Sequence, residues 1–276
     1  MKVSFLVPFK PLNAGKSRLV ADLPRESARE FRDQITRALM EDTVSVLDAF
    51  LEVKVNSNEF SCIVCSKDRI IGELLKEKSG TFHFLEEQLL YRNEEEGYKD
   101  HDFNHVISFM NDHAMEELDV DGTILLMGDL PLLIKEDLHE LINSSIDFMR
   151  RQSPHSPRAV VISPSPGNGC NMLARFPPDF IPTNFSDTIL PSYLANITIA
   201  KERLMQEGLE PNNFILPYIS LPFYLDCDTM DDIANILPIL KNRRPQSRLL
   251  ATLKKWGVSI RKSGSGDNRK LRLAFS

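Results

Sequence analysis

The stretch Val7-Pro-Phe-Lys-Pro-Leu-Asn-Ala-Gly-Lys-Ser-Arg-Leu19 decides how this chain begins to fold. It continues a short apolar run, Val3–Val7, that is typical of a β-strand. The residues after the strand include two lysines, an arginine, a glycine and an asparagine, and a helix is expected to begin near Arg25. Cations and free backbone N–H groups at such a turn favour phosphate, so we expect this loop to bind a phosphate group.

Two other interpretations of this loop stay open. The tripeptide Gly15-Lys16-Ser17 imitates the end of a P-loop, but a P-loop has a glycine five residues before that glycine, where this chain has Lys10. The plainer alternative is a basic loop that is simply solvated. Neither alternative changes the expected order of strand, loop and helix.

Strand-like runs alternate with helical patterns along most of the chain. The expected strands are Val3–Val7, Ser61–Ser66, Thr81–Leu85, Thr123–Met127 and Ala159–Ser163. One expected helix carries Phe31, Ile35 and Leu39, and the others cover Ile70–Leu75, Phe103–Ala114 and Lys135–Arg151. This alternation predicts right-handed βαβ units in a three-layer α/β/α, Rossmann-like fold with a mostly parallel, mixed sheet.

Ligands in such sheets bind outside the carboxyl ends of the strands. That rule places the loop Lys10–Arg18 and the loop after Met127 at the same edge. The second loop contains Asp129, directly after an apolar strand. An aspartate there is placed to coordinate Mg²⁺ together with the phosphates that the ion carries. The alternative role for Asp129 is that of N-cap for the next helix.

A second acidic pair, Asp226 and Asp228, lies further along the chain. Side chains two residues apart on an extended backbone point to the same side, and two such carboxylates suit a divalent ion. Thr229, with Asp231 and Asp232, also resembles the start of a helix. Helix capping is therefore the alternative role for Asp228.

Two further segments carry polar side chains of interest. Gly167–Leu173 is rich in glycine, and such loops leave backbone N–H groups free to hold an anion. His101 and His105 are four residues apart, which allows a metal site but lacks an obvious third ligand. Asn104, between them, is by itself an ordinary polar residue early in a helix.

The run Val7–Leu19 closely resembles the opening signature of the 2-phospho-L-lactate guanylyltransferases, with Gly15 where alanine is usual. The segments around Asp129, around Gly169 and around Asp226 resemble that family in the same order. The resemblance covers residues 1–240 and implies the nucleotidyltransferase version of the three-layer fold.

The resemblance also implies roles for individual residues. It implies catalytic roles for Lys16, Arg18 and Asp129, and Mg²⁺ binding by Asp129, Asp226 and Asp228. It implies nucleotide binding by Pro8, Lys10, Lys16, Asn104, Asp129 and Pro131. It implies acceptor binding by Gly169, Cys170, Asn171, Ser192 and Asn196, with Cys170 where the family has a threonine.

The reaction implied by the resemblance is transfer of GMP from GTP to 2-phospho-L-lactate. The products would be lactyl-2-diphospho-5′-guanosine and pyrophosphate, in coenzyme F(420) biosynthesis. The same chemistry on phosphoenolpyruvate or 3-phosphoglycerate stays open, because a pocket can separate acids of such similar size by only about 1–3 kcal/mol. A sugar-phosphate nucleotidyltransferase is a further alternative, although its Gly-Gly-rich opening loop is missing from this sequence.

The composition fits a globular enzyme with small-molecule substrates. A hydrophobic share of 42% in 276 residues is ample for a packed core. No apolar run approaches the roughly 20 residues of a membrane span, and no signal peptide is expected. Four cysteines do not make a disulfide scaffold, so we expect a cytoplasmic protein.

The net charge of −6 is divided unevenly along the chain. Residues 241–276 hold eleven Lys and Arg against one acidic residue, a net charge of +10, whereas residues 1–240 have a net charge of −16. A basic tail on an acidic body indicates either a nucleic-acid arm or a segment that folds onto an acidic surface. Aliphatic patterning in the tail favours the second interpretation.

The tail itself has a predicted structure. A helix is expected at Gln246–Trp256, followed by a hairpin of Val258–Arg261 and Lys270–Ala274 with its loop at Ser263–Asp267. We therefore expect a nucleotidyltransferase domain at 1–242 and a basic extension at 243–276. The extension is expected to pack on the core or on the partner subunit of a homodimer, and nucleic-acid binding is not expected.

Overall fold

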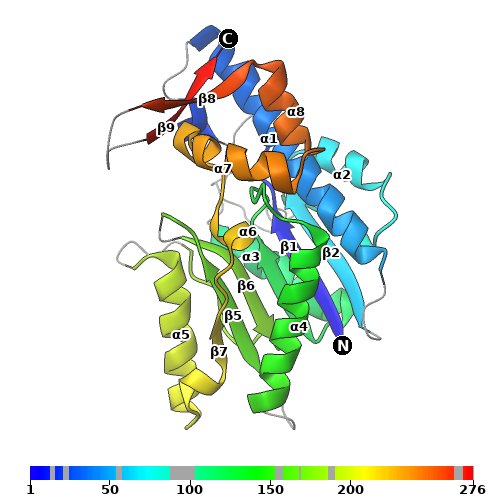
Figure 1. The fold of residues 1–276 in the computed structure, drawn as a ribbon. Coiled ribbons are helices and arrows are strands. Elements are labelled where there is room, and N and C mark those ends of the chain that lie inside the picture. Colours follow the sequence, from blue (N-terminus) through cyan, green and yellow to red (C-terminus); the bar gives the residue numbers. More distant parts are fainter. Residues whose placement is uncertain are drawn as a thin grey trace, which may run out of the picture.

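The structure is a computed structural model that describes residues 1–12, 16–20, 25–53, 58–87, 103–152, 158–167, 169–185, 190–263 and 270–275. A seven-stranded sheet in the order β3-β2-β1-β4-β6-β5-β7 forms its centre (Figure 1). Its strands are β1 (Lys2–Pro8), β2 (Glu59–Ser66), β3 (Phe82–Glu86), β4 (Gly122–Leu126), β5 (Ala159–Pro164), β6 (Cys170–Phe176) and β7 (Ile215–Pro217). A second sheet pairs β8 (Val258–Ser263) with β9 (Lys270–Phe275).

Helices connect these strands. They are α1 (Arg25–Leu51), α2 (Arg69–Leu75), α3 (Phe103–Leu118), α4 (Lys135–Gln152), α5 (Ser192–Gln206), α6 (Leu221–Tyr224), α7 (Met230–Arg243) and α8 (Arg248–Lys255), with 3-10 turns η1 (Ser17–Val20) and η3 (Pro211–Asn213). Every strand and helix that the apolar patterns predicted is present at its expected place. The mostly parallel, mixed sheet is confirmed, because β1 to β4 pair in parallel and β6 runs antiparallel to both β4 and β5.

One segment differs from its expected structure. Cys170 and Asn171, expected in a glycine-rich loop, open strand β6 instead. The reason is that all seven residues of β6 are buried between β4 and β5, so the chain needs ladder hydrogen bonds as soon as it enters the core. Strand β7, which has only three residues, was not predicted, because so short a segment shows no periodicity.

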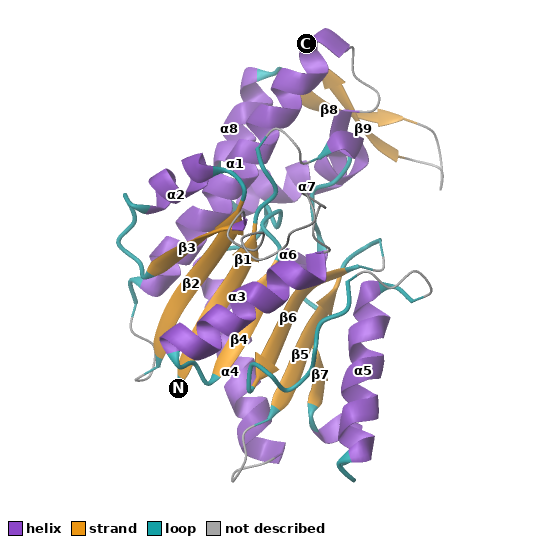
Figure 2. Ribbon diagram, turned by 180° about the vertical axis from the view of Figure 1, so that it is seen from behind, coloured by secondary structure: helices purple, strands orange, loops and turns teal. Residues whose placement is uncertain are grey.

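Two hydrophobic clusters cover the two faces of the large sheet. One contains buried side chains from α1, α2 and α4, such as Leu47 and Ile142. The other contains side chains from α3 and α5, such as Met110 and Leu204. Figure 2 shows α3 crossing in front of the strands, with α5 beside β7 and α4 behind the sheet. The expected three-layer arrangement is therefore confirmed.

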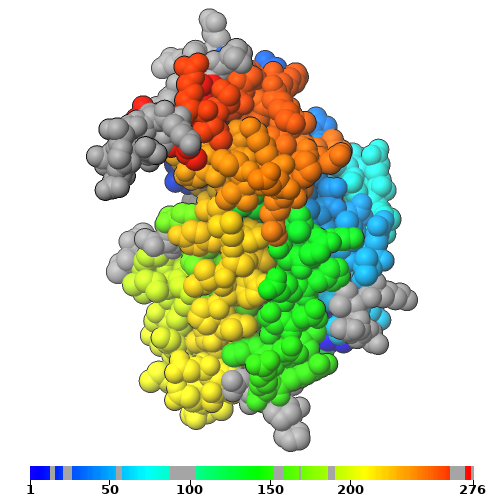
Figure 3. Space-filling view, in the orientation of Figure 1, coloured from blue at the N-terminus to red at the C-terminus, as the bar shows by residue number. Residues whose placement is uncertain are grey.

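A third cluster joins the tail to the body. Leu249, Leu250 and Leu253 of α8 are buried in it together with Phe31 and other residues of α1 and α7. In the space-filling view, the orange surface of α7 and α8 meets the blue surface of α1 on one side and the green surface of the sheet domain beneath α7 (Figure 3). Helix α8, in the predicted extension, thus packs against residues of the predicted first domain. The domain boundary between residues 242 and 243 stays a prediction.

Some predictions fall outside the described residues. They concern residues 13–15 of the opening loop, His101, and the hairpin loop, of which 264–269 are outside the described ranges. Within the described part of the chain, no helix is both long and apolar enough to cross a membrane.

Candidate functional site

The motifs singled out in the sequence converge on one edge of the large sheet. The opening loop follows the carboxyl end of β1, and Asp129 follows that of β4. Strand β6 starts at this same edge because it runs antiparallel to β4. Asp226 and Asp228 lie between α6 and α7, beyond β7. The chain thus brings segments more than 200 residues apart to the place where α/β sheets bind ligands.

At the centre of this edge is a cluster of paired charges. The Lys16 ammonium donates hydrogen bonds to the Asp129 carboxylate and, over 2.6 Å, to Oδ1 of Asp228. Arg18 Nη2 lies 2.5 Å from the other oxygen of Asp228. We call Lys16, Arg18, Asp129, Asp226 and Asp228 the charge cluster. It holds two cations against three carboxylates, so an anionic ligand needs a further cation or a proton.

Lys16 is far less exposed than Arg18, with 11% of its side chain accessible against 74% for the arginine. Burial disfavours its charge, but the nearby Asp129 and Asp228 carboxylates outweigh that effect and raise the pKa of Lys16 above its usual range. Lys16 is therefore a permanent ammonium group. Its φ of 60° lies in the left-handed region, which is uncommon for lysine.

The two aspartates of the second acidic pair have opposite pKa shifts. Burial and the charges of Asp129 and Asp228 raise the pKa of Asp226 to about 6. Burial also acts on Asp228, but the charge of Lys16 and its hydrogen bond lower the pKa of that carboxyl below its usual value. Asp228 is therefore ionised in this arrangement, while Asp226 takes up a proton in mildly acidic solution.

Local packing explains how the Asp129 loop is held. A Cβ atom on Gly128 would lie 2.1 Å from the Phe9 ring, so the close approach of the opening loop requires glycine there. The Thr43 hydroxyl of α1 donates to the Gly128 carbonyl over 3.1 Å. Helix α4 begins only at Lys135, so Asp129 is not its N-cap.

Asp228 is likewise not a helix cap. Thr229 is the N-cap of α7, and it forms a capping box with Asp232. The Asp228 backbone N–H also donates to Asp232, over 3.1 Å. Because neighbours satisfy the helix start, the Asp228 carboxylate is left to pair with Lys16 and Arg18.

The predicted acceptor residues of β6 lie at the same edge. The Ser165 N–H donates to the Gly169 carbonyl over 3.0 Å, which closes a tight turn before β6. A Cβ on Gly169 would lie 2.6 Å from the Ser165 hydroxyl, so glycine leaves room for that group. The Cys170 thiol is buried and donates to the Met172 carbonyl over 3.3 Å, and burial raises its pKa to about 12. A nucleophilic thiolate is therefore not available at this position.

Asn171 connects the two acidic loops. Its side-chain amide donates to the Tyr224 carbonyl over 3.0 Å, close to Asp226 in the chain. Its backbone carbonyl accepts from the Met127 N–H over 3.0 Å, two residues before Asp129. Asn171 therefore fixes the spacing of the two loops that carry the carboxylates.

The polar residues of α3 and α5 are bonded to the protein's own backbone. Asn196 has no exposed surface, and it makes two hydrogen bonds with the backbone of Asn184 and one with the Ser192 carbonyl, at 2.7–2.9 Å. The Asn104 carbonyl oxygen accepts from the Phe185 N–H over 2.8 Å. These side chains fix the segment 184–185 between the starts of two helices.

The remaining predicted nucleotide residues surround the charge cluster. Pro8 ends β1, and Lys10 is exposed in the loop after it. The charge of Lys10 contributes to the lowered pKa of Asp228, which places it within electrostatic reach of the cluster. Pro131 lies two residues after Asp129, and its carbonyl accepts a hydrogen bond from Arg244.

The chemistry of the charge cluster fits a magnesium ion. Carboxylate oxygens are the ligands that Mg²⁺ prefers, and it commonly uses only one or two of them together with substrate phosphates. Within the described ranges no three His, Cys, Asp or Glu side chains form a ready-made metal site. The Lys16 ammonium bridges two of the three carboxylates, so it competes with a metal ion for one oxygen of Asp129 and one oxygen of Asp228.

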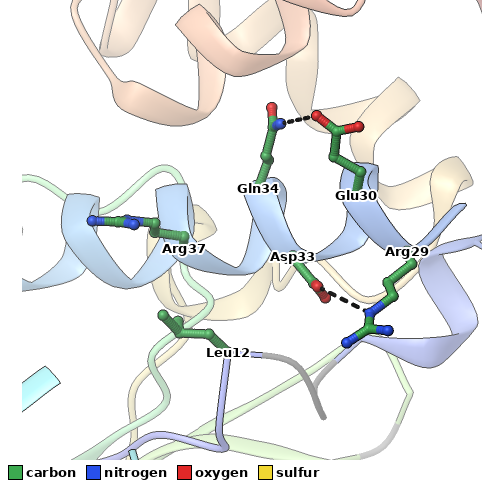
Figure 4. Close-up of a pocket in the computed structure, with 6 residues that line it drawn as sticks. All are labelled: Leu12, Arg29, Glu30, Asp33, Gln34 and Arg37. Atoms are coloured by element: carbon green, nitrogen blue, oxygen red, sulfur yellow. Dashed lines mark hydrogen bonds and ion pairs between the residues drawn. The ribbon is translucent and has the colours of Figure 1, made fainter. Parts of the chain in front are cut away.

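Two surface pockets have no residue of the charge cluster in their lining. One of about 470 Å³ lies on α1 and is lined by Leu12, Arg29, Glu30, Asp33, Gln34 and Arg37. Figure 4 shows that most of its charged side chains pair along the helix, as in the contact of Arg29 with Asp33. The other, of about 500 Å³, lies between α2 and β3. The case for function rests on the paired charges and not on these pockets.

Sequence reasoning did not find the contacts that hold these residues in place. It treated the cations and the carboxylates as separate binding groups, whereas Lys16 and Asp228 pair directly over 212 positions. It also missed Thr43, which looks like any polar residue inside a helix. A useful signal was available, because a lysine loop and an acidic loop of opposite charge were predicted at the same edge.

Comparison with known proteins gives a consistent result. The sequence model of a family described as "Guanylyl transferase CofC like" matches residues 2–272. A relative from Methanocaldococcus jannaschii named 2-phospho-L-lactate guanylyltransferase is 22% identical over 236 residues, 86% of this chain and 83% of the relative. A relative of the same name from another Methanocaldococcus species is 23% identical over 86% of this chain and 81% of its own.

A solved structure resembles the fold. It is a putative nucleotide-diphospho-sugar transferase from Desulfovibrio desulfuricans, with a TM-score of 0.58 and 17% sequence identity. The match covers 92% of this chain and 94% of that one. At this identity the likeness concerns the fold alone, and it supports the three-layer α/β architecture.

Proposed function

The chain belongs to the family described as guanylyl transferase CofC like, and on that premise we propose that it transfers GMP from GTP to 2-phospho-L-lactate. The observation that carries the proposal is the charge cluster, in which Lys16 joins Asp129 to Asp228 at the ligand-binding edge of the sheet. Two relatives named 2-phospho-L-lactate guanylyltransferase support the choice of acceptor. The product then belongs to coenzyme F(420) biosynthesis.

The reaction needs no enzyme nucleophile. A phosphate oxygen of the acceptor attacks the α-phosphorus of GTP in line, and a new P–O–P bond forms. The bond between the α-phosphorus and the bridging oxygen to the β-phosphate breaks, and pyrophosphate leaves with that oxygen. Such transfers depend on positioning and on charge stabilisation in the transition state.

The cations of the cluster neutralise phosphate charge in this proposal. Lys16 leaves its carboxylate partners for a phosphate oxygen of the nucleotide, whose negative charge replaces theirs and keeps the lysine protonated. Arg18, whose side chain is largely exposed, reaches the leaving pyrophosphate or the acceptor phosphate. Lys10 adds a third cation at the mouth of the loop. Charged hydrogen bonds to phosphate are short and directional, so they also orient the α-phosphorus.

The carboxylates released by Lys16 are the proposed magnesium ligands. Asp129 and Asp228 would hold the ion, with Asp226 beside them when it is ionised. When bound, Mg²⁺ offsets negative charge on the phosphate oxygens. Pro8, Asn104 and Pro131 are proposed to shape the nucleotide site, and Asn104 does so in part through the segment that its carbonyl oxygen holds at Phe185.

The acceptor is proposed to bind at the start of β6 and α5. Gly169 and Ser192 lie close together there, since a Cβ on Gly169 would be 4.0 Å from the Ser192 hydroxyl. Cys170 and Asn171 are buried, and Asn196 is fully used by backbone contacts. We therefore propose that Gly169 and Ser192 contact the acceptor, and that Cys170, Asn171 and Asn196 support the surface beneath it.

The test is incubation of the protein with GTP, Mg²⁺ and one acid at a time, with release of pyrophosphate as the measurement. 2-Phospho-L-lactate, phosphoenolpyruvate and 3-phosphoglycerate are compared, and glucose 1-phosphate represents the sugar phosphates. The proposal expects the fastest release with 2-phospho-L-lactate. Faster release with another compound would identify that compound as the acceptor. Salt-dependent RNA binding without any pyrophosphate release would instead support a nucleic-acid-binding protein.

A homodimer and a cytoplasmic location complete the proposal. The hairpin β8–β9 rests on its own chain, because Ile260 and Leu273 pack against the cluster that joins α1, α7 and α8. The hairpin therefore needs no partner subunit to cover these two side chains. The homodimer is proposed from the sequence pattern of the tail alone. Sedimentation velocity tests the assembly, and cell fractionation tests the location.

A further inference from the structure

The loop that carries Asp129 is hydrogen-bonded by the end of α7. Arg244 Nη1 donates to the Pro131 carbonyl over 3.0 Å, and Arg243 Nε donates to the Leu132 carbonyl over 2.9 Å. These carbonyls lie two and three residues after Asp129. The two arginines come from more than 100 positions away, at the start of the basic extension.

Both arginines are themselves held firmly. Arg244 also donates to the Asp42 carbonyl on α1 over 3.3 Å and forms an ion pair with the Asp42 carboxylate over 3.3 Å, and the two side chains are only 10% and 6% exposed. Arg243 pairs with the Asp137 carboxylate near the start of α4. A buried guanidinium with two hydrogen-bond acceptors and an ion-pair partner has little freedom to move, so its contact with Pro131 fixes the loop relative to α1.

The loop is fixed on its other side as well. The Met127 N–H is bonded to the Asn171 carbonyl over 3.0 Å, and Thr43 holds the Gly128 carbonyl over 3.1 Å. Backbone groups both before and after Asp129 thus have partners from distant elements. The Asp129 carboxylate makes its contact with Lys16 from a backbone that is clamped at both ends.

We propose that Arg244, with Arg243, is a positioning residue that holds the Asp129 loop in its reactive geometry. The inference rests on the proposed function and deepens it, and it gives the start of the basic extension a role in catalysis. Loss of the Arg244 contact leaves the Pro131 carbonyl without this donor and loosens the loop. A shift of a catalytic group by about 1 Å can cost up to roughly 100-fold in rate, so the effect is expected on kcat.

The experiment compares Arg244→Met with Arg248→Met. Arg248 is the matched control, because it pairs with Glu41 of α1 over 3.0 Å from the same extension, and within the described ranges it is not bonded to the Asp129 loop. Hydrogen exchange of the amides at 127–134 is measured without ligands, and kcat and KM are measured well below every melting temperature. Arg244→Lys and Arg243→Met are added, so that one variant that fails to fold does not end the test.

Arg244→Met should speed exchange in this loop and lower kcat by about tenfold or more, with a smaller change in the KM for GTP. Arg248→Met should leave both unchanged, and Arg244→Lys should restore part of each. Equal exchange and equal kcat in the Arg244 and Arg248 variants would overturn the inference. Absence of turnover in the wild-type protein would instead reject the proposed function, and the exchange data would still decide whether Arg244 holds the loop.

Discussion

Two regions of the same sheet edge use their polar side chains in opposite ways. Around β1, β4 and α7, charged side chains pair with one another, as Lys16 does with Asp129 and Asp228. Around β6 and α5, polar side chains pair with the backbone, as Asn196 does with Asn184. Both regions were expected to bind substrate, but the first is the one whose groups a charged ligand can rearrange.

The difference follows from what each group leaves behind when it moves. If Lys16 turns to a phosphate, its carboxylates can receive a metal ion, so that every charge keeps a partner. If the Asn196 amide turned to a ligand, the backbone N–H and C=O of Asn184 would lose their partners, at a cost of about 1–3 kcal/mol each. We therefore propose that the paired charges form the reacting site and that the amides bonded to the backbone support it.

The largest expected effect comes from Asp129→Asn. The change keeps the size of the side chain but removes the charge that holds Lys16 and is proposed to hold Mg²⁺. Turnover should fall to almost nothing while the circular dichroism spectrum stays the same, and EDTA should do the same to the wild-type protein. The control is Asp119→Asn, since Asp119 has a 95% exposed side chain far from the edge. Equal activity of the two variants would remove Asp129 from the mechanism.

The next largest effect is expected from the cations. Lys16→Met and Arg18→Met should each lower kcat/KM by about tenfold or more, because charged hydrogen bonds to phosphate are worth roughly 1.5–3 kcal/mol. The buried Lys16 should matter more than the exposed Arg18. Lys2→Met is the control, because Lys2 pairs with Asp119 at the surface, away from the cluster. Similar small losses in all three variants would show that Lys16 and Arg18 do not act on phosphate.

Asn196→Ala tests the other region through stability. The backbone groups that it now satisfies would lose these hydrogen bonds, so the free energy of unfolding in urea should fall by about 1–3 kcal/mol. Asn242→Ala is the matched control, because Asn242 is exposed on α7 and donates to the Pro238 carbonyl over a long 3.4 Å. A variant of unchanged stability that loses activity as Lys16→Met does would show that Asn196 acts on substrate, and the contrast between the two regions would disappear.

The smallest effect concerns pH. Burial, with the charges of Asp129 and Asp228, raises the pKa of Asp226 to about 6 from an ordinary value of 3.8. Between these values the folded protein binds more protons than the unfolded chain, so this group lowers the free energy of unfolding as pH rises through the window. Asp226→Asn should therefore raise the melting temperature at pH 7.5 and change it little at pH 4. A lower melting temperature at pH 7.5 would show that the ionised carboxylate stabilises the fold.

Much of the fold was predictable because its elements are long and their apolar patterns regular. The buried run at β4 and the stripe of α3 needed no tertiary information. The rule that ligands bind at the carboxyl edge was then enough to place Lys16 and Asp129 together from the sequence. The partner of each side chain was not predictable, because hydrogen bonds between distant segments leave no local pattern.

Three residues illustrate that limit. Asn171 was predicted to bind the acceptor from a glycine-rich loop. In the structure it is buried and is hydrogen-bonded to both Tyr224 and Met127, next to the two acidic loops. Asn196 was predicted to contact the acceptor, and no pattern in the sequence shows that its amide is bonded to the backbone of Asn184 and Ser192. In the sequence, Arg244 is one of many charges in a basic tail. In the structure it donates to the carbonyls of Asp42 and Pro131 and so connects α1 to the Asp129 loop.

In the proposed reaction, GTP is cleaved between the α- and β-phosphates at the charge cluster. Phosphorus NMR of GTP, Mg²⁺ and 2-phospho-L-lactate with the protein tests it directly, because it shows which bond breaks. We expect pyrophosphate together with one new diphosphodiester in equal amounts. GDP and inorganic phosphate as the products, or an unchanged spectrum with each of the acids, would contradict it.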